Sequence, residues 1–247
     1  MWYNSSNKNY RGIFMKYKTL LFDADGTLFD FKKGEAEAVK EAFLSVGIEL
    51  DDTLVADYSA INDSLWKMLE RGEIEKKVLL YKRFELFSDK HGFGVDAKQM
   101  ASTYMNMLSQ KNYLFEGAEE LCKALCDKAN MYIVTNGVEF IQKNRYKNSG
   151  LERYFKGLFI SGAIGSEKPS REYFDYVAAN VPNFSRESAL IIGDSLSSDI
   201  KGGVNYGIDT CWYNPNGVSA PEDMPISRIS QNYDDVYAFI TAESEGA

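Results

Sequence analysis

Two aspartates, Asp23 and Asp25, follow a short apolar run near the start of the chain, which reads Leu-Leu-Phe-Asp-Ala-Asp-Gly-Thr-Leu over residues 20–28. An apolar run of this length predicts a buried strand. Because strand side chains alternate between faces, aspartates two positions apart project to the same side. Carboxylates so close repel each other unless a cation lies between them or one of them binds a proton. The pair therefore predicts a bound divalent cation, acid/base chemistry, or both.

The composition narrows the classes of function that this chemistry could serve. A single histidine among 247 residues argues against a Ser-His-Asp triad and excludes a His-rich zinc site, so a metal would bind oxygen ligands, which favours Mg²⁺ over Zn²⁺. A net charge of −8 argues against a nucleic-acid polymer as partner. The three cysteines form no CxxC pair, which fits a reducing compartment. Because no run is apolar enough to span a membrane and no signal-peptide core is present, we expect a cytoplasmic protein without a membrane partner.

The pattern of apolar residues divides the chain into three parts. Residues 1–15 are polar and lack periodicity, which predicts a disordered extension. Apolar residues recur at helical spacing between about 32 and 111, which predicts a four-helix bundle inserted after the first strand. After Gly117, helices alternate with strands, which predicts a parallel, doubly wound sheet. We therefore predict an α/β fold with a Rossmann-like core (16–31 and 113–247) and an all-helical cap (32–112).

Polar residues follow several of the predicted strands at their carboxyl ends. We expect strands at 19–22, 131–134, 158–160, 189–192 and 209–212, with an edge strand at 226–229. Thr135 and Asn136 follow the second of these strands, and Asp194 follows the fourth. In a doubly wound sheet, ligands bind beyond the carboxyl ends of the strands. Together with Asp23 and Asp25, three separate strands therefore bring polar residues to one edge, where we predict the functional site.

Four segments of the sequence resemble the motifs of the haloacid dehalogenase (HAD) superfamily. They are Asp-Ala-Asp-Gly-Thr-Leu (23–28), Val-Thr-Asn-Gly (134–137), Glu-Lys-Pro (167–169) and Gly-Asp-Ser-Leu-Ser-Ser-Asp (193–199), and they occur in the superfamily's order. The first and fourth segments together are highly specific, whereas the other two would each be weak alone. The helical insertion resembles the cap that many members carry between their first and second motifs.

The resemblance implies a covalent mechanism that uses the first two aspartates. Asp23 would be the nucleophile that accepts the phosphoryl group as an aspartyl phosphate. Asp25 would be the general acid for the leaving oxygen and then the general base for the hydrolytic water. Mg²⁺ would be bound by the Asp23 carboxylate, the backbone carbonyl of Asp25, and Asp194.

The resemblance also implies which residues would hold the phosphoryl oxygens. Thr135, the Asn136 amide and Lys168 would contact these oxygens, where charge develops in the transition state. Asp199 would lie behind them and orient Lys168 or the metal-bound waters, although an aspartate at this position could instead solvate the start of a helix.

Within the superfamily, the chain most closely resembles the pyrimidine 5′-nucleotidase branch, through residues 193–203 and 207–215. The implied substrate is a small phosphorylated metabolite, a nucleoside 5′-monophosphate with a pyrimidine base. For the assembly, we expect a monomer or a homodimer. Aromatic faces stack on bases and arginine pairs with their carbonyl edges. Four cap residues are therefore candidates for reading the base, although each could equally be a core or surface residue: Trp66, Arg71, Tyr81 and Arg83.

Three alternatives remain at this stage. The chain could be a phosphatase or mutase acting on small sugar phosphates or phosphoglycolate, because these enzymes share the motifs. A 2-haloacid dehalogenase is disfavoured, because a leaving halide needs no proton and those enzymes lack an acid at the position of Asp25. A non-catalytic regulator that binds phosphorylated ligands is disfavoured, because every catalytic position of the motifs is present.

Overall fold

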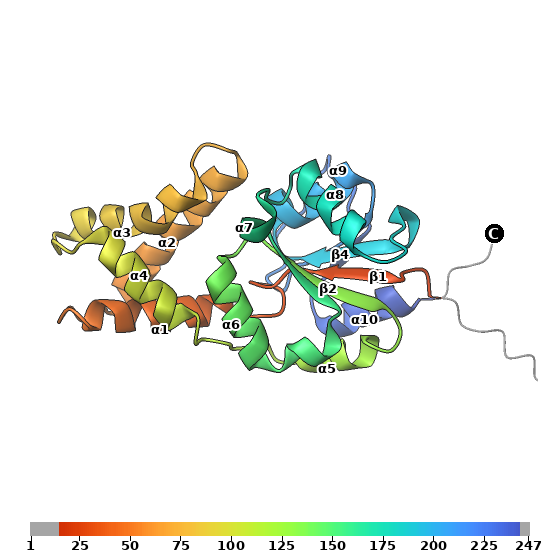
Figure 1. The fold of residues 1–247 in the computed structure, drawn as a ribbon, viewed down its shortest axis with the longest axis horizontal. Coiled ribbons are helices and arrows are strands. Elements are labelled where there is room, and N and C mark those ends of the chain that lie inside the picture. Colours follow the sequence, from red (N-terminus) through yellow and green to blue (C-terminus); the bar gives the residue numbers. More distant parts are fainter. Residues whose placement is uncertain (1–14, 243–247) are drawn as a thin grey trace, which may run out of the picture.

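The computed structural model describes residues 15–242, and the extension predicted at the N-terminus lies outside this range except for Met15. Four helices form one end of the molecule, and a sheet with helices on both sides forms the rest (Figure 1). The four helices are α1 (Phe31–Leu44), α2 (Asp52–Glu70), α3 (Lys76–His91) and α4 (Ala97–Leu108). They occupy the region where the sequence predicts a helical cap, and we call them the cap below.

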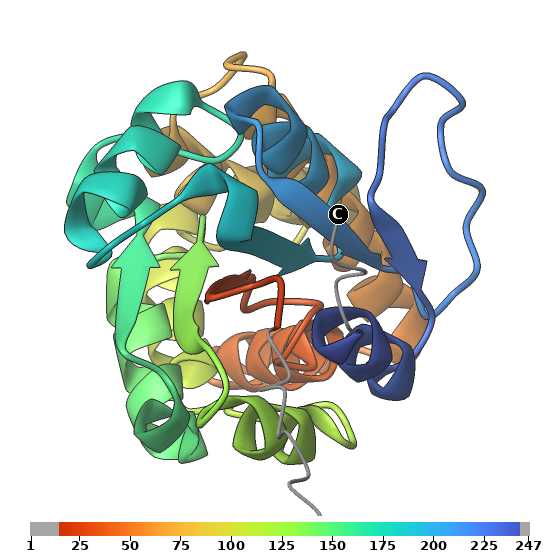
Figure 2. The same ribbon diagram turned by 90° about the vertical axis from the view of Figure 1, so that its right-hand side faces the viewer.

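Six strands of the described residues form one parallel sheet in the order β3-β2-β1-β4-β5-β6. Their bounds are β1 (Thr19–Phe22), β2 (Asn130–Thr135), β3 (Gly157–Ile160), β4 (Ala189–Gly193), β5 (Asp209–Tyr213) and β6 (Arg228–Ser230). The predicted α/β class and the doubly wound sheet are confirmed. The edge strand begins two residues later than predicted, at Arg228, and a long connection leads to it from β5 and extends away from the sheet (Figure 2).

Helices cover both faces of the sheet because its central strands are apolar on both sides. Leu20 and Phe22 of β1 pack with the layer that contains α5 and α10, whereas Leu21 packs with the layer that contains α8. Figure 1 shows α8 and α9 on one side of the strands and α5 and α10 on the other. The remaining helices are α5 (Ala118–Leu125), α6 (Glu139–Ser149), α7 (Ser161–Ile164), α8 (Arg171–Asn180), α9 (Lys201–Tyr206) and α10 (Tyr233–Thr241), with short 3₁₀ or π turns at Leu151–Tyr154, Arg186–Ser188 and Leu196–Ile200.

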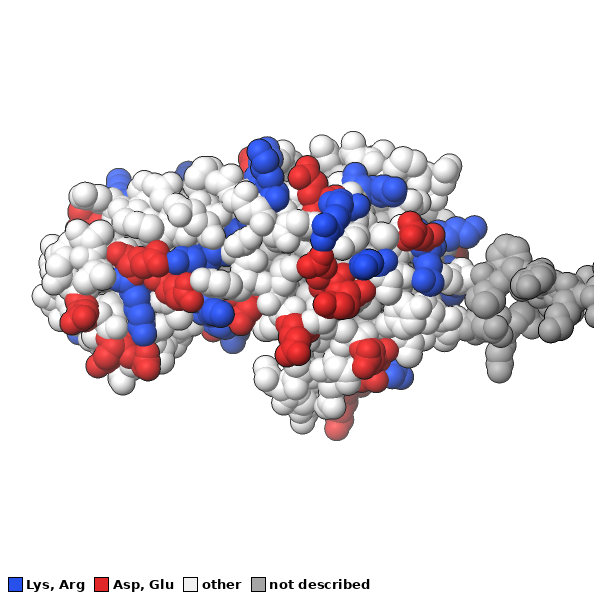
Figure 3. All heavy atoms as spheres, turned by 90° about the horizontal axis from the view of Figure 1, so that it is seen from below, with Lys and Arg blue, Asp and Glu red and all other residues white. Residues whose placement is uncertain are grey.

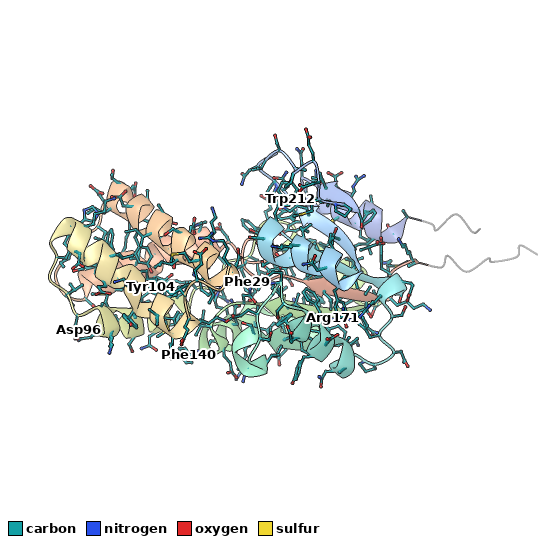
Figure 4. The ribbon with its side chains drawn as sticks, turned by 90° about the horizontal axis from the view of Figure 1, so that it is seen from above. Phe29, Asp96, Tyr104, Phe140, Arg171 and Trp212 are labelled. Carbon is teal, nitrogen blue, oxygen red and sulfur yellow. The ribbon has the colours of Figure 1, made fainter. Side chains whose placement is uncertain are left out.

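The chain enters and leaves the cap through two segments that lie side by side. Asp30 ends the first segment, and its side chain accepts a hydrogen bond from the Lys33 N–H (3.0 Å), which caps α1. The Asp30 N–H donates to the Tyr113 carbonyl (2.9 Å), and the Phe115 N–H donates to the Leu28 carbonyl (3.0 Å). Phe29 lies between these bonds, where the cap meets the core (Figure 4). The cap is therefore joined to the core by a narrow pair of linkers.

The cap has an aromatic core of its own. Its centre is formed by fully buried rings whose centroids lie between 5.3 and 6.4 Å apart, which are Phe43, Tyr58, Phe84, Phe87 and Tyr104. Such pairs stabilise a helical bundle beyond the area that they bury.

On the outside, lysine and arginine are mixed with aspartate and glutamate over the face that Figure 3 shows. Among residues 15–242, no helix has the length and apolar character needed to cross a membrane.

Candidate active site

The site lies at the point where the winding of the sheet changes direction. From β1 the chain continues through β2 to β3 on one side, and β4, β5 and β6 extend the sheet on the other. The loops after β1 and β4 therefore diverge and leave a crevice between them. Gly26, in the first loop, has a φ of +86°, and a Cβ at this position would lie 2.4 Å from the Asp194 Oδ2. Because the Gly26 backbone lies against the Asp194 side chain at the base of this crevice, only glycine fits there.

Three carboxylates meet in this crevice. One oxygen from each of Asp23, Asp194 and Asp199 lies within 4.8 Å of the other two. Burial raises the pKa of Asp23 well above its ordinary value, and the charges of Asp199 and Asp194 add to this effect although Lys168 opposes it. The Asp194 residue as a whole is exposed to solvent, but its carboxylate lies close to the backbone of Gly26. Lost hydration, and then the charge of Asp199, raise the pKa of Asp194 to about 7.

Such a cluster fits a hard divalent cation. Carboxylates that repel one another are stabilised in their charged form when a cation lies among them, and oxygen ligands are those that Mg²⁺ prefers. Asp23 and Asp194 follow neighbouring strands and face the same crevice, so they are suited to bind such an ion. Asp199 is fully buried and, as described next, is already paired.

Lys168 lies at the centre of the site with only 1% of its side chain exposed. Its Nζ donates to Asp23 Oδ1 (2.6 Å), to Asp199 Oδ1 (2.6 Å) and to the Val134 carbonyl (2.8 Å), which uses all three of its donors. Burial disfavours the charge, but Asp199 and Asp23 together raise the pKa of Lys168 above its ordinary value. Lys168 therefore stays charged and lies against the carboxylate predicted to be the nucleophile.

Two residues of the predicted site hold Lys168 in place. The second oxygen of Asp199 accepts from the Ser195 N–H (3.1 Å), so this carboxylate is buried and shared rather than solvating a helix start. The Asn136 side chain donates to the Lys168 carbonyl (2.8 Å) and accepts from the Lys168 N–H (2.9 Å). These two bonds fix the Asn136 side chain against the main chain of Lys168.

Two buried threonines, Thr135 and Thr27, lie near the site. Thr135 ends β2, and its Oγ1 accepts from the Gly137 N–H (3.0 Å), which leaves its hydroxyl hydrogen for another acceptor. Thr27 donates to Asp194 Oδ1 (3.3 Å). The Trp212 indole donates to the Asp194 carbonyl (2.8 Å), so the loop after β4 is held from both sides.

Asp25 is held by two side chains that the sequence analysis did not single out. One oxygen accepts from Gln142 and the other forms an ion pair with Arg145. Both partners are buried on α6, three positions apart on one helix face. The sequence does contain a signal for this pair, because the helix after the second motif carries two long polar residues three positions apart, which lie on one face of the helix.

The structure separates the four cap candidates into two pairs. A pocket beside Asp25 is lined by residues of the cap and of α6, among them Trp66 and Arg83. Arg71 is exposed and forms an ion pair with Glu73 (2.6 Å), and Tyr81 lies under the Lys98 ammonium (5.6 Å). Arg71 and Tyr81 do not line the pocket, so the structure does not bring them to the site with Trp66 and Arg83.

Arg83 is held in a fixed orientation at the edge of this pocket. It is 2% exposed, and its Nη1 donates to Asn62 (3.0 Å), which in turn donates to the buried Glu35 (2.7 Å). Its guanidinium lies 4.6 Å from the centre of the Tyr104 ring. Its Nη2 is buried and has no hydrogen-bond partner within the protein, so this donor is available to a ligand.

Comparison with known proteins identifies the family. Residues 17–207 match the family model described as a haloacid dehalogenase-like hydrolase. The chain belongs to this family of hydrolases. The HAD-like hydrolase is 38% identical to the HAD-hydrolase YfnB of Bacillus subtilis over 93% of this chain and 97% of YfnB. It is 37% identical to the pyrimidine 5′-nucleotidase PynA of Streptococcus pneumoniae (82% of this chain, 86% of PynA) and 33% identical to the pyrimidine 5′-nucleotidase YjjG of Escherichia coli (85% and 92%).

Solved structures agree with this assignment. The crystal structure of YfnB bound to magnesium matches the HAD-like hydrolase with a TM-score of 0.88 at 37% identity, over 91% of this chain and 99% of YfnB. L-2-haloacid dehalogenase from Xanthobacter autotrophicus matches with a TM-score of 0.71 at 17% identity (92% and 100%), which shows a shared fold. The family that the four motifs resemble is therefore confirmed, and so is the likeness of the chain to the pyrimidine 5′-nucleotidase branch.

Proposed function

We propose that this HAD-like hydrolase is a Mg²⁺-dependent phosphomonoesterase that acts through an aspartyl phosphate on pyrimidine nucleoside 5′-monophosphates. The observation that carries the proposal is the buried Lys168 ammonium, 2.6 Å from both Asp23 and Asp199, beside a cluster that Asp194 completes. A nucleophile, a fixed cation and a metal-binding edge in one crevice are the parts that phosphoryl transfer requires. The names of PynA and YjjG support the substrate.

Asp23, the backbone carbonyl of Asp25, and Asp194 would hold the magnesium ion. When bound, the ion would supply positive charge to the phosphoryl oxygens and to the nucleophile. The raised pKa values of Asp23 and Asp194 support this role, because they mark carboxylates that lack a nearby cation sufficient to balance them. The magnesium-bound structure of YfnB supports the same choice of metal.

The reaction would run in two displacements. First, an Asp23 oxygen bonds to phosphorus, the ester P–O bond breaks, and the leaving oxygen takes a proton from the Asp25 carboxylic acid. Second, a water attacks phosphorus and gives its proton to the Asp25 carboxylate, and the P–O bond to Asp23 breaks. Lys168 and the Thr135 hydroxyl would stabilise the charge on the phosphoryl oxygens in both steps.

The pocket between the cap and α6 would bind the leaving group after the cap moves away from α6, because its volume of about 30 Å³ is too small for a base. Trp66 offers an aromatic face on which a base can stack. The free Nη2 of Arg83 would donate to the C2 carbonyl, which cytosine, uracil and thymine share. The Glu35–Asn62 contact fixes this donor, so little conformational entropy would be lost when the base binds.

A phosphate-release screen with Mg²⁺ tests the proposal. The panel is the pyrimidine and purine nucleoside 5′-monophosphates, with a hexose phosphate and phosphoglycolate as competing classes. We expect the highest kcat/KM with the pyrimidine nucleotides. Higher kcat/KM for a sugar phosphate or phosphoglycolate would overturn the substrate, and absence of phosphate release from every ester would overturn the activity.

A further inference from the structure

Arg145 joins the predicted acid/base residue to both linkers of the cap. Its side chain is fully buried, and its Nη1 forms an ion pair with Asp25. Its Nε donates to the Lys111 carbonyl (2.8 Å), and its guanidinium lies 4.5 Å from the centre of the Phe29 ring. Phe29 belongs to the linker that enters the cap, and Lys111 begins the linker that leaves it, just after α4. One side chain of α6 thus contacts two segments that are distant in sequence, the loop of Asp25 and Phe29 and the chain at Lys111.

Both oxygens of Asp25 accept a hydrogen bond from a side chain of α6. Arg145 and Gln142 each donate to one of its two oxygens. Each carboxylate oxygen has two acceptor positions, so one position on each oxygen stays available for a proton or for the leaving group. The two donors therefore fix the direction in which Asp25 can give or accept a proton.

The contacts of Arg145 connect the orientation of Asp25 to the linkers of the cap. Because Arg145 bonds to the main chain of one linker and packs on a ring of the other, a displacement of the linkers displaces its guanidinium as well. Packed buried groups shift between discrete arrangements rather than deforming continuously. The guanidinium also lines the pocket beside Asp25, and its Nη2 is buried without a partner.

We propose that Arg145 is a positioning residue that couples the cap linkers to Asp25, so that the arrangement of the linkers sets the orientation of this carboxylate. This inference rests on the proposed phosphomonoesterase function. A purely structural role fits the contacts less well, because a buried ion pair often contributes little more than an apolar replacement of equal volume. A coupling role accounts for both the charge and the placement at the junction.

The two displacements depend differently on Asp25, and this difference provides the test. p-Nitrophenolate leaves without a proton, so transfer of its phosphoryl group to Asp23 does not need the acid. Hydrolysis of the aspartyl phosphate still needs Asp25 as the base, because the attacking water must lose a proton. Uridine 5′-monophosphate has a poor leaving group, so both of its steps need Asp25.

The experiment is stopped-flow release of p-nitrophenolate with Mg²⁺, alongside steady-state turnover of uridine 5′-monophosphate. For Arg145→Lys, we expect the first turnover of p-nitrophenyl phosphate to stay within about threefold of the unmodified protein. Later turnovers, and turnover of the nucleotide, should slow by about 10- to 100-fold, which is part of the roughly 10²- to 10⁴-fold that acid/base catalysis contributes. The signature is a burst of about one p-nitrophenolate per site.

Two further variants keep the result interpretable. Gln142→Ala removes the other donor to Asp25 without removing a buried charge, so it tests the same separation of steps if Arg145→Lys does not fold. Arg153→Lys changes an exposed arginine that pairs with Glu119 and should match the unmodified protein. Equal slowing of first and later turnovers in the folded variants, or no slowing, would overturn the coupling. Failure of the unmodified protein to hydrolyse either ester would instead overturn the proposed function.

Discussion

The Lys168 Nζ lies 2.6 Å from Asp23 Oδ1, although the two residues are 145 positions apart in the chain. The same ammonium also contacts Asp199, so one buried positive charge is shared by two buried carboxylates. Unpaired charges at this depth would be costly, and the contact therefore both stabilises the fold and orients the group proposed as the nucleophile. The predictions below follow from this arrangement and from the pocket beside it.

Asp23→Asn should abolish turnover of every phosphate ester, because an amide oxygen is far less nucleophilic than a carboxylate and cannot form the acyl phosphate. The measurement is phosphate release with Mg²⁺, together with circular dichroism to show that the variant is folded. Asp175→Asn, which changes an exposed aspartate on α8, serves as the matched control. Robust turnover by the Asp23 variant would contradict the covalent mechanism.

Lys168→Met should lower the free energy of unfolding by about 3–5 kcal/mol, the usual effect of removing one partner from a buried ion pair. Asp23 and Asp199 would then face each other without a cation. Urea unfolding at pH 7 without added metal measures this change. Lys201→Met, at the exposed start of α9, should shift the urea midpoint little. An equally small decrease in the free energy of unfolding for Lys168→Met would show that the buried ion pair does not stabilise the fold.

The stability of the metal-free protein should fall as the pH rises from 5 to 7. The pKa of Asp194 is raised from 3.8 to about 7, so between these values the folded state keeps a proton that the unfolded state has released. A raised folded-state pKa contributes stability at low pH that is lost as the pH passes through the folded value, and Asp23 acts with the same sign. Urea midpoints across this range measure the slope. Asp194→Asn should flatten it, and an unchanged slope would contradict the assignment.

Removal of divalent metal with EDTA should reduce turnover to background, and excess Mg²⁺ should restore it, because the carboxylate cluster needs a cation to hold the phosphoryl group. The ion should also raise the melting temperature, since it binds the folded state. This rise should be larger at pH 7.5 than at pH 5.5, because protons compete for the same carboxylates. A rate unaffected by EDTA would remove magnesium from the mechanism.

Arg83→Met should lower kcat/KM for uridine 5′-monophosphate by about 10- to 100-fold, which corresponds to a lost charged hydrogen bond of about 1.5–3 kcal/mol. Turnover of p-nitrophenyl phosphate, which has no base, should change much less. Arg71→Met is the matched control, because this arginine is exposed and pairs with Glu73. Equal losses on both substrates would assign Arg83 to the stability of the cap rather than to recognition of the base.

The sequence by itself determined the fold class and the edge of the sheet at which the site lies. A short apolar run predicts a strand, and the polar residues that follow the run lie at the carboxyl end of that strand. The sequence therefore predicts that Asp23, Thr135 and Asp194 lie at one edge of the sheet. The resemblance to the HAD motifs also implies that Asp199 lies near Lys168, and the structure shows this contact. The edge strand begins two residues later than the sequence predicts, because the segment 226–229 carries only a weak apolar signal.

Only the tertiary structure decided which side chains surround Asp25 and which cap residues face the pocket. The ion pair between Arg145 and Asp25 spans 120 positions and depends on how α6 is rotated against the first loop. The separation of Trp66 and Arg83 from Arg71 and Tyr81 depends on how the cap packs over the core. Local periodicity tells which face of a helix is apolar, but rotation and docking are set by contacts between distant segments, and no spacing within one segment encodes them.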